Sequence, residues 1–254
     1  MPLHFARRDR VAVLTLDDPD RRNALTPALV QEIVAVVDGF EDDEGVGALV
    51  VTGAPPAFCS GADVGALGAM SAGGQERDSL PSIYEGFLRV HRCTLPTVAA
   101  VNGPAVGAGL NLALVCDVRV ASPAARFDCR FARIGLHPGG GHTRLLTEAV
   151  GPQAAAAMVL AGESPDGERA AAIGLAWTCV DAADLLAEAI RIAGRAADLP
   201  RELARRVKAS LRETPRQPSL DDAVALELER QRWSIEQGFF AEQRAKAEAR
   251  RRRP

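Results

Sequence analysis

Residues 95–117 read LPTVAAVNGPAVGAGLNLALVCD and describe a strand, a turn and a helix in succession. The β-branched, apolar run Thr97 to Val101 predicts a strand, and Asn102 to Pro104 predicts a turn. The small residues Gly107 to Gly109 then open an apolar helix. Small residues let a ligand approach the backbone closely, and the first N–H groups of a helix have no partner within it. This stretch therefore predicts a site for an anion, or for a carbonyl oxygen that becomes one.

Composition narrows the class of protein. The chain has 254 residues, 47% of them hydrophobic and 25% charged, with a net charge of −3. These values are typical of a globular protein and argue against a nucleic-acid partner, which requires a basic surface. The five cysteines lie singly, without metal-ligand spacing, so no metal is expected. Because no secretory leader and no apolar run of about 18 residues stands out, we expect a cytoplasmic protein without a membrane span.

The order of elements favours an α/β core followed by helices. Val11 to Leu16 and Ala48 to Thr52 predict strands, and Thr26 predicts the cap of a helix that reaches about Phe40. A helix is expected at about 80–93 and a further strand at 118–121. The segment from Arg126 to Ile134 is expected to hold broken extended pieces.

After Gly141 the pattern changes and helices are expected. Their predicted ranges are 143–150, 152–160, 167–173, 184–197, 201–212 and 219–237. Ser219 begins the last of them with a capping pattern. Strands and helices in front with helices behind are typical of an α/β core with a helical C-terminal region.

A second backbone site follows the buried strand at 48–52. Residues 58–63 read FCSGAD, and Ser60, Gly61 and Ala62 leave the main chain uncovered at the end of that strand. Ligands of α/β sheets gather at such strand ends. Since two converging N–H groups stabilise an oxyanion better than one, this segment is the natural complement of the helix start at 107–109.

Together these stretches resemble the crotonase (enoyl-CoA hydratase/isomerase) superfamily. Three more stretches agree with it. RRNAL at 21–25 resembles the loop on the adenine side of coenzyme A. IGLHPGGGHTR at 134–144 resembles the loop and helix that close the acyl pocket, and GERAAAIGLAWTCV at 167–180 resembles the segment that follows. The resemblance runs from about residue 5 to about residue 240.

The resemblance implies an α/β fold, a crotonase-like spiral of ββα units with a helical C-terminal region. It implies a spiral core with the coenzyme A site over residues 1–198 and a helical oligomerisation region over 199–254, in a homotrimer or a dimer of trimers. The substrate would be an acyl-CoA thioester of the kind found in fatty acid metabolism. Coenzyme A would arrive as part of that substrate, so no separate cofactor is expected.

The resemblance also assigns site residues. The oxyanion hole falls to the N–H groups of Ala62 and Ala108, which would stabilise an enolate-like thioester. The other residues implied to bind substrate are Arg22, Ala24, Ser60, Gly61, Asp63, Val64, Gly107, Phe131, Pro138 and Gly139.

The sequence departs from the family at the two glutamates that hydratases place around one water. Their positions are Asn111 and Phe131 here. Asn111 can orient a water or the substrate but cannot take a proton at neutral pH, and Phe131 can do neither. General acid–base catalysis contributes about 10²–10⁴-fold per group. Gly139 to Gly141 also fill the loop where dienoyl isomerases and aryl-CoA dehalogenases of the family carry an aspartate.

Other side chains are candidates for the missing chemistry. His142 follows the glycines at a helix start, where the helix dipole lowers a histidine pKa and favours a neutral base. A capping or surface role is the simpler interpretation of this histidine. His137, Tyr84 and Asp128 are further candidates, as are the acids Glu76, Asp78 and Glu85, for which a solvated loop position is the simpler interpretation.

These observations leave two functions open and disfavour a third. The first is an enzyme of the enoyl-CoA hydratase/isomerase type, a lyase or isomerase, that relies on enolate stabilisation. A decarboxylase or another acyl-CoA lyase of the same fold would use that stabilisation without a base. The second is an acyl-CoA-binding protein that has lost the chemistry. A dinucleotide-binding oxidoreductase is disfavoured because residues 103–109 lack the GxGxxG pattern.

Overall fold

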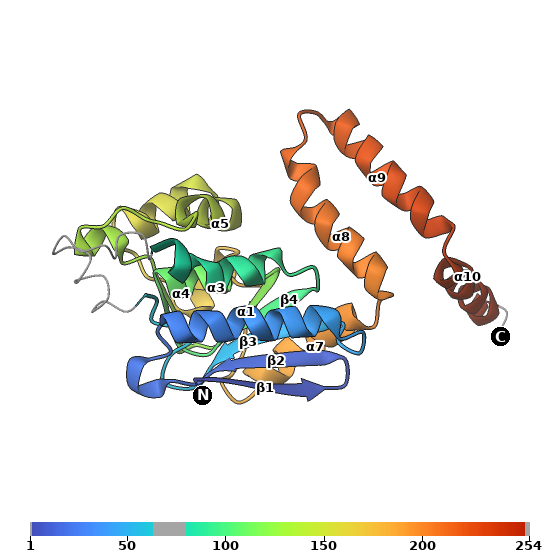
Figure 1. The fold of residues 1–254 in the computed structure, drawn as a ribbon. Coiled ribbons are helices and arrows are strands. Elements are labelled where there is room, and N and C mark those ends of the chain that lie inside the picture. Colours follow the sequence, from blue (N-terminus) through green and yellow to red (C-terminus); the bar gives the residue numbers. More distant parts are fainter. Residues whose placement is uncertain (1, 63–79, 252–254) are drawn as a thin grey trace.

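The computed structural model describes residues 2–62 and 80–251. Within them one sheet has the strand order β1-β2-β3-β4-β6-β8 (Figure 1). β1 pairs with β2 antiparallel, and every later neighbour pairs parallel. The bounds of the strands are β1 Leu3–Arg8, β2 Val11–Leu16, β3 Ala48–Gly53, β4 Thr97–Val101, β6 Val118–Ala121 and β8 Thr178–Cys179.

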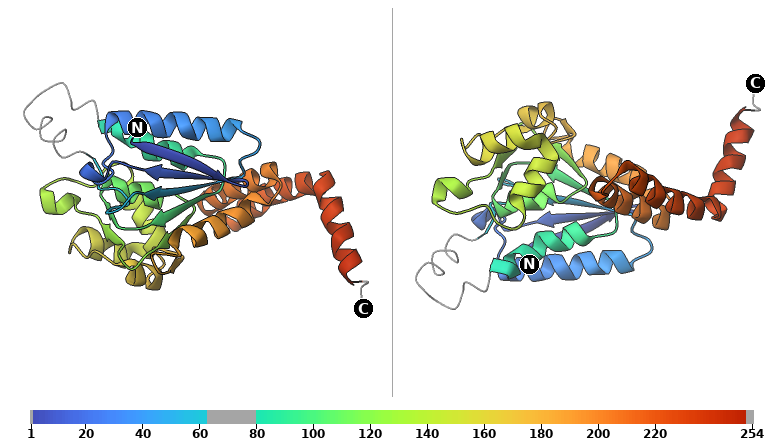
Figure 2. Two further views of the ribbon diagram at one scale, coloured as in Figure 1. Left: turned by 90° about the horizontal axis from the view of Figure 1, so that it is seen from below. Right: turned by 90° about the horizontal axis from the view of Figure 1, so that it is seen from above.

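Alternating residues of the strands fill a core on each face of the sheet. Val51 and Ala99 belong to the core shared with helices α1 and α3, whereas Val50 and Ala100 belong to the core shared with α7. This is the period of two that a strand buried on both faces requires. The helices are α1 Pro27–Asp42, α3 Leu80–Arg92 and α7 Leu185–Ala197. α1 and α3 lie side by side over one face in both figures (Figure 2).

A second, two-stranded sheet carries the functional turn. β5 (Pro104–Val106) pairs in parallel with β7 (Arg126–Asp128), and helix α4 (Ala108–Leu114) starts two residues after β5. A side chain at Gly109 would overlap the carbonyl of Cys59, so a glycine is required there. The start of α4 therefore packs directly against the segment at 59–62.

The helices behind the core confirm the sequence-based order. α5 (His142–Val159) breaks at Gly151, which has a φ of 75° and precedes Pro152. The later helices are α6 Gly167–Ala172, α8 Arg201–Glu213, α9 Leu220–Ile235 and α10 Gly238–Arg251. Ser219 caps α9 by accepting from the N–H of Asp222. α8 to α10 project away from the sheet (Figures 1 and 2).

The structure corrects one interpretation and adds elements. The segment from Arg126 to Ile134 is not a run of extended pieces: β7 is followed by a 3-10 helix over Phe131–Ile134. β1, β5 and α10 were not expected. Pro104, predicted to be part of a turn, begins β5, where the pairing does not need its missing N–H.

Helix α8 is attached to the core through a buried charge. Lys208 is 5% exposed, and its ammonium nitrogen lies 2.7 Å from Oδ2 of Asp117. The Arg212 guanidinium lies 3.1 Å from the other carboxylate oxygen, and the N–H and hydroxyl of Thr97 donate to Oδ2 at 2.8 and 2.9 Å. Asp117 therefore has a structural role.

Replacing Asp117 with alanine is expected to lower the free energy of unfolding by about 2 kcal/mol, because the buried Lys208 charge loses its counter-ion. The loss stays below that of a fully buried pair because Lys208 also donates to the Leu95 carbonyl. Urea unfolding measures it. Glu148→Ala is the matched control, since its ion pair with Arg144 is exposed and should contribute less than about 1 kcal/mol. Equal losses in the two variants would contradict this explanation.

Candidate active site

A pocket of about 170 Å³ lies where the segment at 60–62, helix α3, the start of α4 and the 3-10 helix at 131–134 meet. The described residues that line it are Ser60, Gly61, Ala62, Ile83, Tyr84, Val106, Gly107, Ala108, Asn111, Arg130, Phe131, Ile134, Leu136, His137 and Gly139. Sequence segments some 80 residues apart thus share one small cavity, as the resemblance implied.

The two backbone segments predicted to form the oxyanion hole are in contact. The Val106 N–H donates to the Cys59 carbonyl at 2.9 Å. Gly61 has a φ of 91°, and a Cβ built on it would lie 3.3 Å from the amide nitrogen of Ala108. Only a glycine takes this conformation and this approach without strain.

The N–H groups of Ala62 and Ala108 are available to a ligand. Within the described residues neither donates to a backbone carbonyl. Ala108 is the first residue of α4, where an N–H has no partner in its own helix. Both residues line the pocket, so both amides are candidates to bind an oxygen there.

The loop at 21–25 is bonded to the same segment. The N–H of Ser60 donates to the Arg22 carbonyl at 3.0 Å, and the Leu25 N–H donates to the Gly61 carbonyl at 2.8 Å. The buried Asn23 side chain holds the loop by donating to the carbonyls of Ala54 and Ala57 at 2.8 Å. Arg22 and Ala24 therefore lie beside the segment at 60–62 but not in the pocket lining.

Both polar groups of the Asn111 amide have protein partners. Its Nδ2 donates to the Gly139 carbonyl at 3.1 Å, and its Oδ1 lies 2.7 Å from Nδ1 of His142. A side chain at Gly140 would meet Phe87 and Nδ2 of Asn111, so a glycine there lets the loop reach the amide. Asn111 thus connects helix α4 to the glycine loop at residues 139–141 and to the first residue of α5.

His142 is buried and neutral. It is 1% exposed, and burial lowers its pKa to about 4. Because Oδ1 of Asn111 can only accept, the proton of the neutral ring lies on Nδ1. Nε2 is buried without a hydrogen-bond partner among the described residues. His142 therefore contacts Asn111 and is not part of the described pocket lining.

The ring of Phe131 packs against the pair formed by Asn111 and His142. Its ring centroid lies 5.0 Å from that of His142, edge to face, and its Cζ lies 3.5 Å from a Cβ built on Gly107. An apolar ring therefore covers the helix start at Gly107.

The structure brings most of the predicted site residues together. Ala62, Ala108 and Asn111 line the pocket, as do Ser60, Gly61, Gly107, Phe131 and Gly139, whereas Pro138 does not. Asp63, Val64, Glu76 and Asp78 lie outside the described residues. Tyr84 and His137 are in the lining, and Asp128 and Glu85 are not. Ile83, Val106 and Arg130 were missed, although Arg130 directly precedes Phe131 in the sequence.

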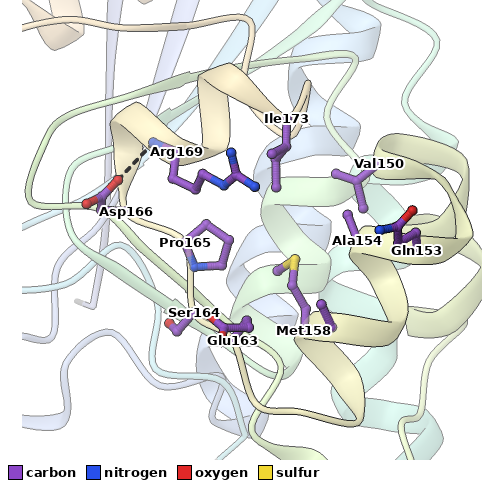
Figure 3. Close-up of a pocket in the computed structure, with 11 residues that line it drawn as sticks. Val150, Gln153, Ala154, Met158, Glu163, Ser164, Pro165, Asp166, Arg169 and Ile173 are labelled. Atoms are coloured by element: carbon purple, nitrogen blue, oxygen red, sulfur yellow. Dashed lines mark hydrogen bonds between the residues drawn. The ribbon is translucent and has the colours of Figure 1, made fainter.

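A larger pocket, of about 630 Å³, lies elsewhere, between α5 and α6 (Figure 3). Figure 3 shows Met158 and Pro165 in its floor, and Asp166 accepting from the N–H of Arg169 at 2.8 Å. That bond is the N-terminal cap of α6. None of the predicted site residues lines this pocket, so volume alone does not identify the functional site.

Comparisons with known proteins agree with the fold. The sequence model of the enoyl-CoA hydratase/isomerase family matches residues 6–248. The probable enoyl-CoA hydratase EchA14 of Mycobacterium tuberculosis is 48% identical over 98% of both chains. The crystal structure of an enoyl-CoA hydratase subunit from Geobacillus kaustophilus superposes with a TM-score of 0.89 at 31% identity, covering 100% of this chain and 97% of that one.

A structure described as a putative enoyl-CoA hydratase from Streptomyces coelicolor also has a TM-score of 0.89, at 32% identity over 100% of this chain and 93% of that one. The chain belongs to the enoyl-CoA hydratase/isomerase family and has the crotonase fold. Among the described helices, none combines the length and apolarity needed to cross a bilayer.

Proposed function

We propose that the protein is an acyl-CoA enzyme of the enoyl-CoA hydratase/isomerase type that stabilises a thioester enolate with the N–H groups of Ala62 and Ala108. The observation that carries the proposal is that these amides lack backbone partners among the described residues and line one pocket. Each such donor contributes about 3–4 kcal/mol to the stabilisation of a developing oxyanion.

The side chains of the pocket favour a reaction that needs no strong base. Its described lining contains no aspartate or glutamate, and His142 is neutral and hydrogen-bonded to Asn111. Efficient hydration requires groups that deprotonate water and protonate carbon. An acyl-CoA with a carboxylate on its α-carbon loses CO₂ when the bond between that carbon and the carboxylate breaks, and the bond's electrons form the enolate without a base. A decarboxylase or a related lyase therefore fits the lining better. Asn111 would position a water or the substrate.

The remaining site residues extend this proposal along the substrate. Arg22 and Ala24 would contact the adenine side of coenzyme A, and Asp63, Val64 and Pro138 would complete the thioester site. Coenzyme A would enter as part of the substrate, without a separate cofactor.

Residues 1–198 would form the core that holds this site, and residues 199–254 would mediate assembly into a homotrimer or a dimer of trimers. Exposed apolar side chains on α8 and α9, such as Leu211, Leu220 and Val224, support such an assembly. All five cysteines are free, which suits the reducing cytoplasm.

A second candidate is an acyl-CoA-binding protein without catalytic activity. Phe131 favours it, because its ring packs against His142 and places an apolar surface at the position of a family glutamate. In that case the pocket would bind the thioester and leave it unchanged.

A panel of thioesters tests both candidates. Crotonyl-CoA, methylmalonyl-CoA and the unreactive butyryl-CoA are assayed for binding by calorimetry and for turnover by chromatography. We expect all three thioesters to bind. Crotonyl-CoA should be hydrated with a kcat far below the value typical of enzymes, which is about 10 s⁻¹. Hydration at or above that rate would overturn the inference from the missing glutamates. Binding without turnover of any thioester would establish the binding protein, and no binding would overturn both candidates.

A further inference from the structure

Asp128 holds two arginines beside the pocket. Its side chain is 10% exposed, and its Oδ2 accepts from Nε and Nη2 of Arg130 at 3.2 and 3.0 Å. Its Oδ1 accepts from the Arg130 N–H at 2.8 Å and from the Arg133 guanidinium. One carboxylate therefore faces two guanidinium groups, which leaves the cluster with one positive charge.

The two arginines differ in position. Arg130 lines the pocket, whereas Arg133 does not and instead lies against Gly162. No aspartate or glutamate is among the described lining residues. Asp128, outside that lining, is shared between the two arginines, so the cluster keeps an excess positive charge beside the pocket. Phe131, Ile134 and Leu136, which follow Arg130 in the sequence, form an apolar wall of the same pocket.

The backbone holds Arg130 in a fixed relation to the predicted oxyanion hole. Arg130 has a φ of 41°, a backbone conformation that residues other than glycine rarely adopt. The hydrogen bond from its N–H to Asp128 offsets the free-energy cost of this conformation. The carbonyl of the same Asp128 accepts from the N–H of Gly107 at 2.9 Å, directly before Ala108. One residue thus positions both the cation and the start of α4.

We propose that Arg130 makes the site selective for acyl groups whose far end carries a carboxylate. The inference rests on the proposed function, because it assumes that the pocket receives the acyl part of a CoA thioester. The methylene groups of such a substrate would cover the apolar wall, and its carboxylate would meet the guanidinium in a charge-assisted hydrogen bond. An uncharged chain of equal length would cover the cluster without balancing its excess positive charge.

The test compares two saturated thioesters with six-carbon acyl chains, adipoyl-CoA and hexanoyl-CoA, by isothermal titration calorimetry. The full chain is expected to bind adipoyl-CoA about tenfold more tightly, which corresponds to about 1.4 kcal/mol. Arg130→Met should bring the two affinities to within about twofold of each other. Arg130→Lys should keep part of the preference, because the charge remains. Arg133→Met is the comparison variant. It keeps the guanidinium at the pocket but removes the excess positive charge of the cluster, so it should keep a larger part of the preference than Arg130→Met does.

The outcomes separate this inference from the proposed function. Equal affinities in the unmodified protein would overturn the selectivity and leave the acyl-CoA site intact. If Arg130→Met weakens both thioesters equally, Arg130 contacts the coenzyme A part and the inference fails. If Arg133→Met loses as much preference as Arg130→Met, contact at Arg130 is not the cause. Failure of both thioesters to bind would overturn the proposed function itself. Circular dichroism verifies that each variant is folded.

Discussion

If the protein turns over an acyl-CoA thioester as proposed, replacing Ala108 with proline is expected to lower kcat/KM about 10²–10³-fold, because it removes one donor of the proposed oxyanion hole. Ala108 is the first residue of α4, where a helix tolerates proline and no internal hydrogen bond is lost. The change therefore removes the N–H group while the helix is preserved. Steady-state kinetics measures the effect.

Ala108→Gly is the control, because it shortens the side chain but keeps the N–H. We expect it to retain activity within about threefold, since glycine at a helix start costs little. The melting temperature of both variants must be compared, because the proline ring approaches Gly61. If both variants are folded and equally active, the amide of residue 108 does not stabilise the transition state.

Local signals in the sequence predicted the elements that surround the site. Thr26 and Ser219 cap their helices as expected, since a hydroxyl at that position satisfies a free N–H within three residues. The fully apolar run at 48–52 predicted a strand buried on both faces, and β3 is buried throughout. β5 escaped prediction because three residues carry no period, and its pairing with β7 depends on residues some 20 positions away.

The site was predictable in its backbone and not in its side-chain contacts. Gly61 and Gly109 indicated close approaches of the main chain, and a Cβ built on either would overlap a backbone carbonyl oxygen. The bond between Asn111 and His142 joins two elements through tertiary packing, which no local pattern encodes. The same holds for Arg130, whose place at the pocket depends on Asp128.

The polar interior beside the pocket consists of neutral groups. The Asn111 amide bonds to the Gly139 carbonyl and to His142, and the Phe131 ring packs edge to face against the imidazole. A buried polar network of neutral groups avoids the cost of isolated charges. It also ties the site to one protonation state, which makes its stability dependent on pH.

The stability of the protein is expected to fall by about 3 kcal/mol as the pH decreases from 6.5 to 4, on account of His142 alone. Burial lowers the pKa of His142 from 6.5 to about 4. In this window the unfolded chain binds a proton that the folded chain excludes. The contribution is therefore fully present above pH 6.5 and is lost as the pH falls toward 4. Urea unfolding between pH 7.5 and 4.5 measures it.

His142→Gln isolates this effect, because glutamine can donate to Oδ1 of Asn111 and does not titrate. Burial and nearby arginines also lower the pKa of His91, and hydrogen bonds from Thr94 and Arg89 lower that of Glu41, so the unmodified protein has other acid-sensitive groups. Those contributions are common to both proteins and cancel in the difference between their unfolding curves. His137→Gln, at an exposed histidine, should keep the full pH dependence. If His142→Gln loses stability with the same slope as the unmodified protein, the buried imidazole is charged or hydrated in the folded state, and the neutral Nδ1–H form that orients Asn111 is wrong.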